Sequence, residues 1–296
     1  MTENEFLAER FEEYRGHLRS VAYRMLGSLA EADDAVQEAW LRVSRADTDE
    51  VQNLGGWLTT VVARVSLNML RSRRTRGEEP LETHVPDPVV TRDDGADPEQ
   101  QVVLADSVGL ALLIVLDTLG PAERLAFVLH DMFAVPFEEI ADILDRSPTA
   151  VRQLASRARR RVQGQPAAAE PDVSRQRRVV DAFLAAARAG DFEALVNVLH
   201  PDVVLRADGG LAAPHLSQEI HGAAAVAGSA LLFQRTAGAA DARRVLVNGA
   251  LGSVALVDGR PTSLLAFTVA DDRIVAMTVL ADPDRLAAVD WTVLDD

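Results

Sequence analysis

The chain has 296 residues and a formal net charge of −15, with nearly half of its residues apolar and a quarter charged. That length exceeds what one small core usually serves, so we expect two or three domains of ordinary globular composition. The absence of cysteine excludes disulfides, thiol nucleophiles and thiolate metal sites. The six histidines are scattered without the helical pairing that would predict a zinc site.

The first residues, MTENEFLAERFEEY, are acidic and amphipathic, whereas a secretory signal has a basic start followed by an apolar core. No uninterrupted apolar run approaches the roughly 20 residues needed to cross a bilayer. We therefore expect a cytoplasmic protein that has no membrane partner and binds neither a cofactor nor a metal.

Composition divides the chain into five segments. Residues 1–76 predict helices, and residues 77–100 are rich in Pro, Asp and Glu, which predicts an acidic linker. Residues 101–163 predict helices again, and residues 164–173 predict a second, short linker. Residues 174–296 change character: two helices are followed by Val- and Leu-rich stretches that Asp-Gly and Asp-Asp turns separate.

The charge is sorted along the chain. Leu54–Arg76 contains five arginines and no acid, and Arg146–Gln163 contains six arginines and no acid. The spacer Gly77–Leu110 carries nine acids against one arginine. Because local potential decides where a polyanion docks, the acidic net charge does not exclude nucleic acid. Two basic helical surfaces in an acidic protein are predicted.

The helix around residues 33–43 has two unlike faces. Val36, Ala39, Trp40 and Val43 recur at helical spacing and predict a core-facing stripe. On charge alone, the opposite face is best explained as a solvated acidic surface. Its residues are Asp33, Asp34, Gln37, Glu38 and Leu41.

The next helix, which Gly55 and Gly56 are expected to precede as a turn, combines an apolar stripe with a basic face. Basic residues with an embedded Asn can hold phosphates and hydrogen-bond to base edges. A face that only aids solubility normally mixes charges of both signs, so DNA binding is favoured. The predicted contacts are Arg64, Asn68, Arg71, Arg73 and Arg74.

A helix-turn-helix is predicted near residue 147. Pro136 can open a short helix through Leu144, Ser147 suits an N-cap, and Pro148 suits the first helical position. The second helix is basic on its exposed face, as a recognition helix in a major groove would be. The alternative is a basic amphipathic helix that enters no groove. The predicted DNA contacts are Ser147, Thr149, Arg152, Gln153, Ser156, Arg157 and Arg160.

The stretches ADDAVQEAWLRV and GGWLTTVVARVSLNMLRSRR resemble region 2 of the extracytoplasmic-function (ECF) sigma factors. The block from Leu116 to Val162 resembles their region 4. The resemblance implies that the acidic face with Asp33 docks on the clamp of core RNA polymerase, which replaces the solvated-surface interpretation. It also implies that the helix with Arg64 and Asn68 recognises the minus-ten promoter element, and that the helix from Ser147 reads the minus-thirty-five element.

Residues 174–296 extend beyond the usual end of an ECF sigma factor. Ser174 and Asp191 are expected to cap two helices, and strands near residues 244–247, 253–257, 263–269 and 274–280 are expected to curl around helices. The pattern resembles a SnoaL-like domain, an α+β cone with a cavity, fused after region 4. The predicted fold is multidomain: two all-α sigma domains, the second a helix-turn-helix, followed by an α+β SnoaL-like cone.

Three motifs of that ECF subgroup can be recognised in this sequence, and they match the subgroup's pattern to different extents. The resemblance implies that the extra domain packs against the sigma regions and regulates them in cis through these segments. The linker motif contributes Pro86, Asp87 and Pro88, and the glycine motif, whose second half is missing, contributes Asp208, Gly209 and Gly210. The tail motif contributes Asp282, Pro283, Asp284, Arg285 and Leu286.

Another function stays open at this point: a helix-turn-helix transcription regulator with a ligand-sensing or enzymatic SnoaL-like domain. The cavity could hold an unknown small ligand. The acid/base candidates for catalysis are His200, Asp208, His215, His221 and Asp272, but their spacing defines no active-site geometry. We therefore expect no catalytic residues, and we expect core RNA polymerase and promoter DNA as partners.

Overall fold

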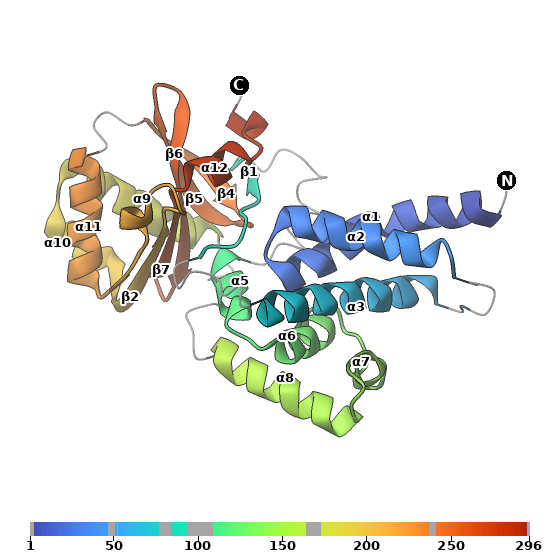
Figure 1. Cartoon of the computed structure of the whole chain (residues 1–296). Coiled ribbons are helices and arrows are strands. Elements are labelled where there is room, and N and C mark those ends of the chain that lie inside the picture. The colour runs from blue at the N-terminus through green and yellow to red at the C-terminus, as the bar shows by residue number, and fades with distance from the viewer. Residues whose placement is uncertain are drawn as a thin grey trace. The chain divides into compact units, whose positions relative to one another are not determined.

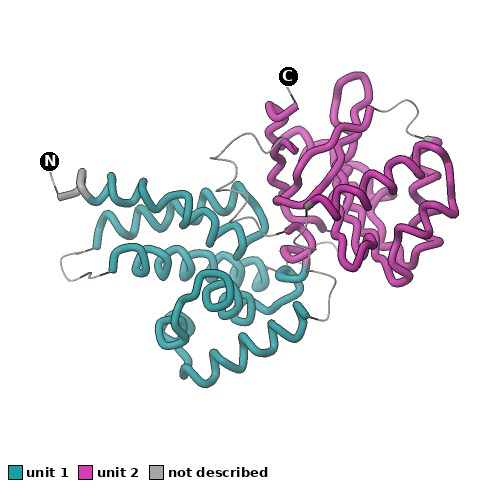
Figure 2. Tube along the Cα trace, turned by 180° about the vertical axis from the view of Figure 1, so that it is seen from behind, with its two compact units in different colours: residues 1–79, 115–165 teal, residues 80–114, 166–296 magenta. Residues whose placement is uncertain are grey.

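The computed structural model describes residues 3–46, 51, 53–76, 84–93, 109–163, 173–236 and 241–294. The chain forms two compact units, each of which takes up two stretches of sequence (Figure 2). Unit 1 contains residues 1–79 and 115–165, and unit 2 contains residues 80–114 and 166–296. The expected short linker at 164–173 lies outside the described residues except for its last position. No described helix is long and apolar enough to cross a membrane.

The first half of unit 1 is a bundle of three helices, α1 (Glu3–Leu26), α2 (Leu29–Val43) and α3 (Leu54–Thr75). Its core is built from large side chains such as Phe11, Leu18, Met25 and Leu58, each at most 1% exposed. The bundle follows the predicted apolar stripes, because residues spaced at i, i+3 and i+4 share one helical face.

Gly55 and Gly56 do not precede α3, as the sequence suggested, but lie in its first turn. Asn53 caps the helix by accepting a hydrogen bond from the backbone N–H of Gly56. A Cβ atom at position 55 would stand 2.9 Å from the ring of Tyr14. The glycine therefore serves close helix packing rather than a turn.

The second half of unit 1 contains five short helical elements. They are α5 (Leu110–Asp117), whose last three residues belong to this unit, α6 (Pro121–Phe127), the π-helical η1 (Val128–Met132), α7 (Phe137–Leu144) and α8 (Pro148–Gln163). The turn between α7 and α8 is as predicted: Asp145 adopts a left-handed conformation, and the Ser147 hydroxyl accepts a hydrogen bond from the N–H of Ala150. The helix-turn-helix is confirmed.

Unit 2 is a seven-stranded sheet with helices packed on it, in the strand order β1-β4-β5-β6-β7-β2-β3. Among the strands that the structure describes, only β2 and β7 pair in parallel. The strands are β1 (Val90–Thr91), β2 (Leu199–Asp208), β3 (Gln218–His221), β4 (Asp241–Val247), β5 (Ala250–Val257), β6 (Arg260–Ala270) and β7 (Arg273–Leu280). The expected strands are confirmed.

Helices α9 (Val173–Ala189), α10 (Phe192–Val198) and α11 (Ala223–Thr236) lie together beside the sheet (Figure 1). Short elements complete unit 2: η2 (Pro214–Leu216), α12 (Pro283–Ala287) and η3 (Thr292–Leu294). Asp191 caps α10 as predicted, but Ser174 lies inside α9, which begins at Val173.

An apolar cluster occupies the space between these helices and the sheet, where the sequence suggested a cavity. Phe183 and Phe267 meet edge to face at 5.5 Å, and Leu195, Val226 and Ile274 around them are fully buried. Close packing of this kind makes the interior a core.

Candidate nucleic-acid interface

The outer face of α8 carries the predicted recognition residues. Val151, Leu154, Ala155 and Ala158 are buried against the rest of unit 1, which turns the opposite side of the helix to solvent. That side forms a shallow depression of about 420 Å³. Its lining consists of Thr149, Arg152, Gln153, Ser156, Arg157 and Arg160, all exposed.

Partners within unit 1 hold two of these arginines without burying them. Arg152 donates to Glu138 over 2.9 Å and stacks over the ring of Phe137. Arg157 lies 3.6 Å from Glu123. Such contacts of solvent-exposed arginines contribute little stability and orient side chains that retain further donors. The α8 face can therefore offer guanidinium and amide groups to base edges and phosphates.

The outer face of α3 is basic as predicted. Asn68, Arg71 and Arg74 are exposed along the helix, and Arg64 is exposed at its middle. The guanidinium of Arg64 donates to the backbone carbonyl of Asp142 over 3.2 Å.

Arg73 has a different role from the DNA contact that the sequence suggested. It forms an ion pair with Glu31 and donates to the backbone carbonyl of Leu26 over 3.3 Å. The last carbonyls of a helix have no partner within it, and a cation near them also interacts favourably with the helix dipole. Arg73 therefore fastens α3 to the junction between α1 and α2.

The acidic face of α2 is exposed along its whole length. Asp33, Asp34, Gln37, Glu38 and Leu41 all face solvent, and Leu41 is 43% exposed. Two of the carboxylates have basic neighbours, since Asp33 pairs with Arg19 at 2.7 Å and Glu38 with Arg42 at 3.0 Å. The face is therefore open to solvent along α2, as a docking surface would have to be.

In unit 2, the three motifs singled out in the sequence come together around a buried carboxylate. Asp208, only 2% exposed, accepts hydrogen bonds from the backbone N–H of Val85 at 2.9 Å and from Arg285 at 2.8 Å. The second guanidinium nitrogen of Arg285 donates to Asp87 over 2.9 Å and to the carbonyl of Val85. We call these four residues, Val85, Asp87, Asp208 and Arg285, the linker clasp.

The surroundings of the clasp hold it in place. Asp282 caps α12 by accepting from the N–H groups of Asp284 and Arg285, which places Arg285. Gly210 has a φ of +64° and lies so close to the Asp282 carboxylate that a Cβ atom would overlap it. Of the remaining motif residues, Pro86, Pro88, Gly209 and Leu286 are buried, whereas Pro283 and Asp284 are exposed.

Downstream of the clasp, the acidic linker continues as strand β1 at the edge of the sheet. Val90 and Thr91 pair antiparallel with Val247 and Leu246 of β4. Just before the strand, Val89 and Asn248 exchange two hydrogen bonds of 2.9 and 2.8 Å. Further along, Arg177 of α9 donates to Asp93 over 2.6 Å. The described part of the linker, residues 84–93, is therefore an integral part of unit 2.

Comparison with known proteins agrees with this arrangement. Residues 10–76 match the family of sigma-70 region 2, and residues 110–162 match sigma-70 region 4. The chain is 44% identical to the ECF RNA polymerase sigma factor SigJ of Mycobacterium tuberculosis (strain ATCC 25618 / H37Rv) over 287 residues, which cover 93% of this chain and 91% of SigJ. The chain belongs to the ECF sigma factors.

Two further similarities support the assignment. A probable ECF RNA polymerase sigma factor, SigI of Mycobacterium tuberculosis (strain CDC 1551 / Oshkosh), is 38% identical over 206 residues, or 69% of this chain and 70% of SigI. The crystal structure of the SigJ sigma factor from the same species superposes with a TM-score of 0.73 at 38% identity, covering 95% of this chain and 99% of that one. This ECF sigma factor thus has the predicted fold: helical regions 2 and 4 followed by a SnoaL-like α+β domain.

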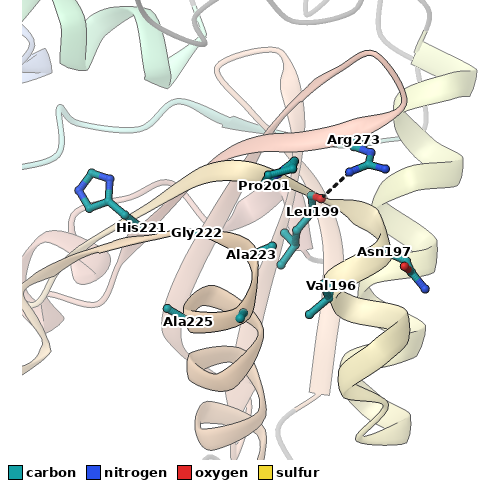
Figure 3. Close-up of a pocket in the computed structure, with 10 residues that line it drawn as sticks. Val196, Asn197, Leu199, Pro201, His221, Gly222, Ala223, Ala225 and Arg273 are labelled. Carbon is teal, nitrogen blue, oxygen red and sulfur yellow. Dashed lines mark hydrogen bonds between the residues drawn. The ribbon is translucent and has the colours of Figure 1, made fainter.

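A surface pocket of about 590 Å³ lies in the SnoaL-like domain where α10 meets β2 and α11 begins (Figure 3). Its polar lining residues are Asn197, His221 and Arg273. Arg273 is directed at the backbone carbonyl of Leu199, and the His221 ring nitrogen Nε2 lies 3.0 Å from the Glu219 carboxylate. These groups do not converge on one point, and the lining gives no chemical reason for a particular ligand.

Some functional contacts of this sigma factor were not predicted from the sequence. Asn248 accepts a hydrogen bond from Val89 of the linker. It stands in an Asn-Gly pair, which is typical of a hairpin turn, so the sequence could predict the turn but not the contact with the linker. Arg124 and Phe133 connect region 4 to region 2 through partners about a hundred residues away. No local pattern marks such contacts.

Proposed function

We propose that this ECF sigma factor binds core RNA polymerase through the acidic face of α2 and directs it to promoters that α3 and α8 recognise. The observation that carries the proposal is the exposed, acid-free face of α8, whose six lining residues combine Arg and Gln side chains with hydroxyl groups. Arg and Gln are the side chains that read guanine and adenine edges in a major groove. Such a function takes place in the bacterial cytoplasm, where polymerase and DNA are found.

On α3, the proposed contacts to the minus-ten element are Arg64, Asn68, Arg71 and Arg74, without Arg73. On α8, the proposed contacts to the minus-thirty-five element are Ser147 and the six residues that line the depression. Basic residues of this kind position the protein on the phosphate backbone, while Asn68 and Gln153 are suited to base contacts.

We further propose that the SnoaL-like domain modulates the sigma regions in cis through the linker clasp. The linker connects α3 to α5 and therefore lies between regions 2 and 4 in the chain. Residues 84–93 are held by hydrogen bonds that join Val85, Asp87, Val89 and Asp93 to the rest of unit 2, and by a strand pairing. If these contacts changed, the mobility of the linker would change with them. The linker is the covalent connection between the two sigma regions, so their relative movement would also be affected.

This regulatory role requires no catalysis by the SnoaL-like domain. Asp208 is engaged by the linker, and His215 and His221 are exposed. The hydrogen bond from Arg175 lowers the pKa of Asp272, whereas a general acid or base needs a pKa near the working pH. These features support a module that acts by binding.

The test of polymerase binding is co-purification with core enzyme. The full-length chain is expected to retain core polymerase on a column, and Leu41→Arg is expected to weaken that retention at least tenfold. Phe192→Arg is a matched control, because Phe192 is equally exposed at 43% but lies in unit 2. Retention that is absent for the parent chain, or unchanged in Leu41→Arg, would contradict the proposed docking face. If the parent chain itself does not retain core polymerase, a transcription regulator that binds DNA without polymerase would describe the protein better.

A further inference from the structure

The charges of the linker clasp are not balanced. Two carboxylates, those of Asp208 and Asp87, share the single guanidinium of Arg285 at 2.8 and 2.9 Å. In their ionised forms the three groups leave one negative charge without a counter-charge. Asp208 is only 2% exposed, so water does little to compensate for that charge. The clasp should therefore attract a further positive charge.

His84 stands where that charge is needed. It is the first described residue of the linker, and its ring nitrogen Nδ1 lies 3.7 Å from Oδ2 of Asp208. The same oxygen accepts hydrogen bonds from the Val85 N–H and from Arg285. A neutral imidazole carries no net charge, whereas the protonated ring adds one positive charge. Protonation of His84 therefore completes the charge balance of the clasp.

The His84 side chain is also open to solvent. It is 40% exposed, so its ring can exchange a proton with water while the linker stays docked. A contact with a buried carboxylate is screened by salt less than an ion pair between two exposed groups is. The position of His84 thus combines access for a proton with an influence on a buried charge.

The surroundings of His84 are rich in acidic groups. Asp282 on α12, 8% exposed, lies against Gly210, two positions after Asp208, and Asp284 follows it on the surface. The sequence just before His84 contains three glutamates, Glu78, Glu79 and Glu82. The parts of the sequence outside the described residues contain no Arg, Lys or His. Negative charges near an imidazole favour its protonated form.

Basic side chains on the elements around the clasp are engaged by other acids. These pairs join Arg206 of β2 to Glu219, Arg177 of α9 to Asp93, and Arg243 and Arg244 of β4 to Asp241 and Asp181. The next basic residue on the linker, Arg92, comes only after strand β1. Among the described residues, His84 is therefore the side chain placed to supply the missing positive charge.

We propose that the linker clasp is a pH-sensitive switch: protonation of His84 strengthens the docking of residues 84–93 on the SnoaL-like domain. Proton binding at His84 and docking of the linker favour each other. The added stabilisation is complete below about pH 6.5, the ordinary pKa of histidine, and is lost as the pH rises above that value. This inference rests on the proposed function, in which the docked linker regulates the sigma regions in cis.

Hydrogen exchange at the Val85 amide measures the docking directly, because this N–H donates to Asp208. Rates are corrected for the exchange of an unprotected amide at each pH. In the full chain, we expect protection at Val85 to increase roughly three- to tenfold from about pH 8 to about pH 6. His84→Gln should lack this increase, and His84→Arg should keep the high protection at both pH values, because its charge does not titrate. Equal pH responses in the parent and His84→Gln would overturn the proposal.

His221→Gln is the matched control. The His221 ring also lies close to a carboxylate, that of Glu219 at 3.0 Å, but it belongs to β3, at the opposite edge of the sheet from β1. This variant should therefore keep the pH response of the parent at the Val85 amide. Loss of the response in His221→Gln would assign the effect to a histidine outside the clasp and contradict the role of His84.

Run-off transcription at the same two pH values separates this inference from the function on which it rests. We expect the ratio of transcript from the parent to transcript from His84→Gln to differ between them, because a ratio removes the pH dependence of the polymerase itself. The ratio of the parent to His221→Gln should stay constant. A pH response in hydrogen exchange with a constant parent to His84→Gln ratio would overturn the regulatory part of the inference. Failure of the parent to produce any polymerase-dependent transcript would overturn the proposed function instead.

Discussion

At the residue scale, the linker clasp depends on one buried carboxylate. Asp208→Asn keeps the shape of the side chain but removes the charge that Arg285 and the Val85 N–H share. We expect it to destabilise unit 2 by about 1–3 kcal/mol, because hydrogen bonds to a charged acceptor weaken and Arg285 loses its partner. Urea unfolding followed through Trp291 measures this, since Trp291 donates to the carbonyl of Leu286 beside the clasp.

That measurement uses a background in which Trp40 and Trp57 are replaced by Phe, so that only unit 2 is observed. The matched control is Asp272→Asn, which removes an exposed ion pair with Arg175. Exposed ion pairs contribute little to the free energy of unfolding, so the control should have the same urea midpoint as the parent. Equal midpoints for Asp208→Asn and Asp272→Asn would show that the clasp does not stabilise unit 2.

Gly210 tests the fit between the glycine motif and the tail motif. Gly210→Ala and Gly259→Ala both place a side chain at positive φ, which costs roughly 1–2 kcal/mol. Only at position 210 would the new Cβ also overlap the Asp282 carboxylate, while position 259 has no atom within 4 Å. We therefore expect the lower unfolding midpoint for Gly210→Ala in the same fluorescence experiment. Similar midpoints would mean that Asp282 and α12 move aside without cost.

Residue roles were predictable from the sequence where they follow from helical periodicity. The exposed faces of α2 and α8 and the Ser147 cap needed only the 3.6-residue repeat and the residue types. Arg73 was misassigned because its partners, Leu26 and Glu31, lie more than 40 positions away. A basic residue next to a DNA-binding face has the same sequence signal whether it binds phosphate or a helix end.

At the element scale, α8 is predicted to act as the recognition helix. Arg157→Ala should weaken binding to a minus-thirty-five duplex by about 1–3 kcal/mol if the guanidinium contacts a base edge in bidentate fashion. Fluorescence anisotropy with labelled DNA at fixed salt measures the change. Arg159→Ala is the control on the same helix, because Arg159 does not line the depression and pairs with Asp131 at 2.5 Å. A larger loss of affinity for Arg159→Ala than for Arg157→Ala would mean that another face binds DNA.

Elements with strong local signals were predicted well, and those that depend on distant pairing were not. The strands after residue 240 alternate and end at Asn-Gly, Asp-Gly and Asp-Asp turns, whose residues adopt positive φ. Strand β1 has two residues in a segment rich in Pro and Asp, and it exists because β4 supplies its partner. The composition of the linker therefore indicated a free chain, although its described part is docked.

At the scale of the whole molecule, the compact units do not follow the order of segments along the chain, because each unit is built from two separate stretches of sequence. The sequence separates regions 2 and 4 by a linker, yet they share unit 1, and the linker belongs to the SnoaL-like unit. Local signals mark helices and strands, but which helices pack together is decided by side chains such as Arg124 and Phe133. The expectation that the SnoaL-like domain packs against the sigma regions remains a prediction.

The central claim is that this chain is a promoter-specificity subunit whose output depends on its SnoaL-like domain. Run-off transcription of fragmented genomic DNA with core polymerase, read by sequencing, tests it most directly. We predict defined start sites that appear only when the chain is added, and a strong change in their yield when the chain ends at residue 163. The absence of chain-dependent start sites from both proteins would contradict the account, and equal yields would contradict regulation in cis.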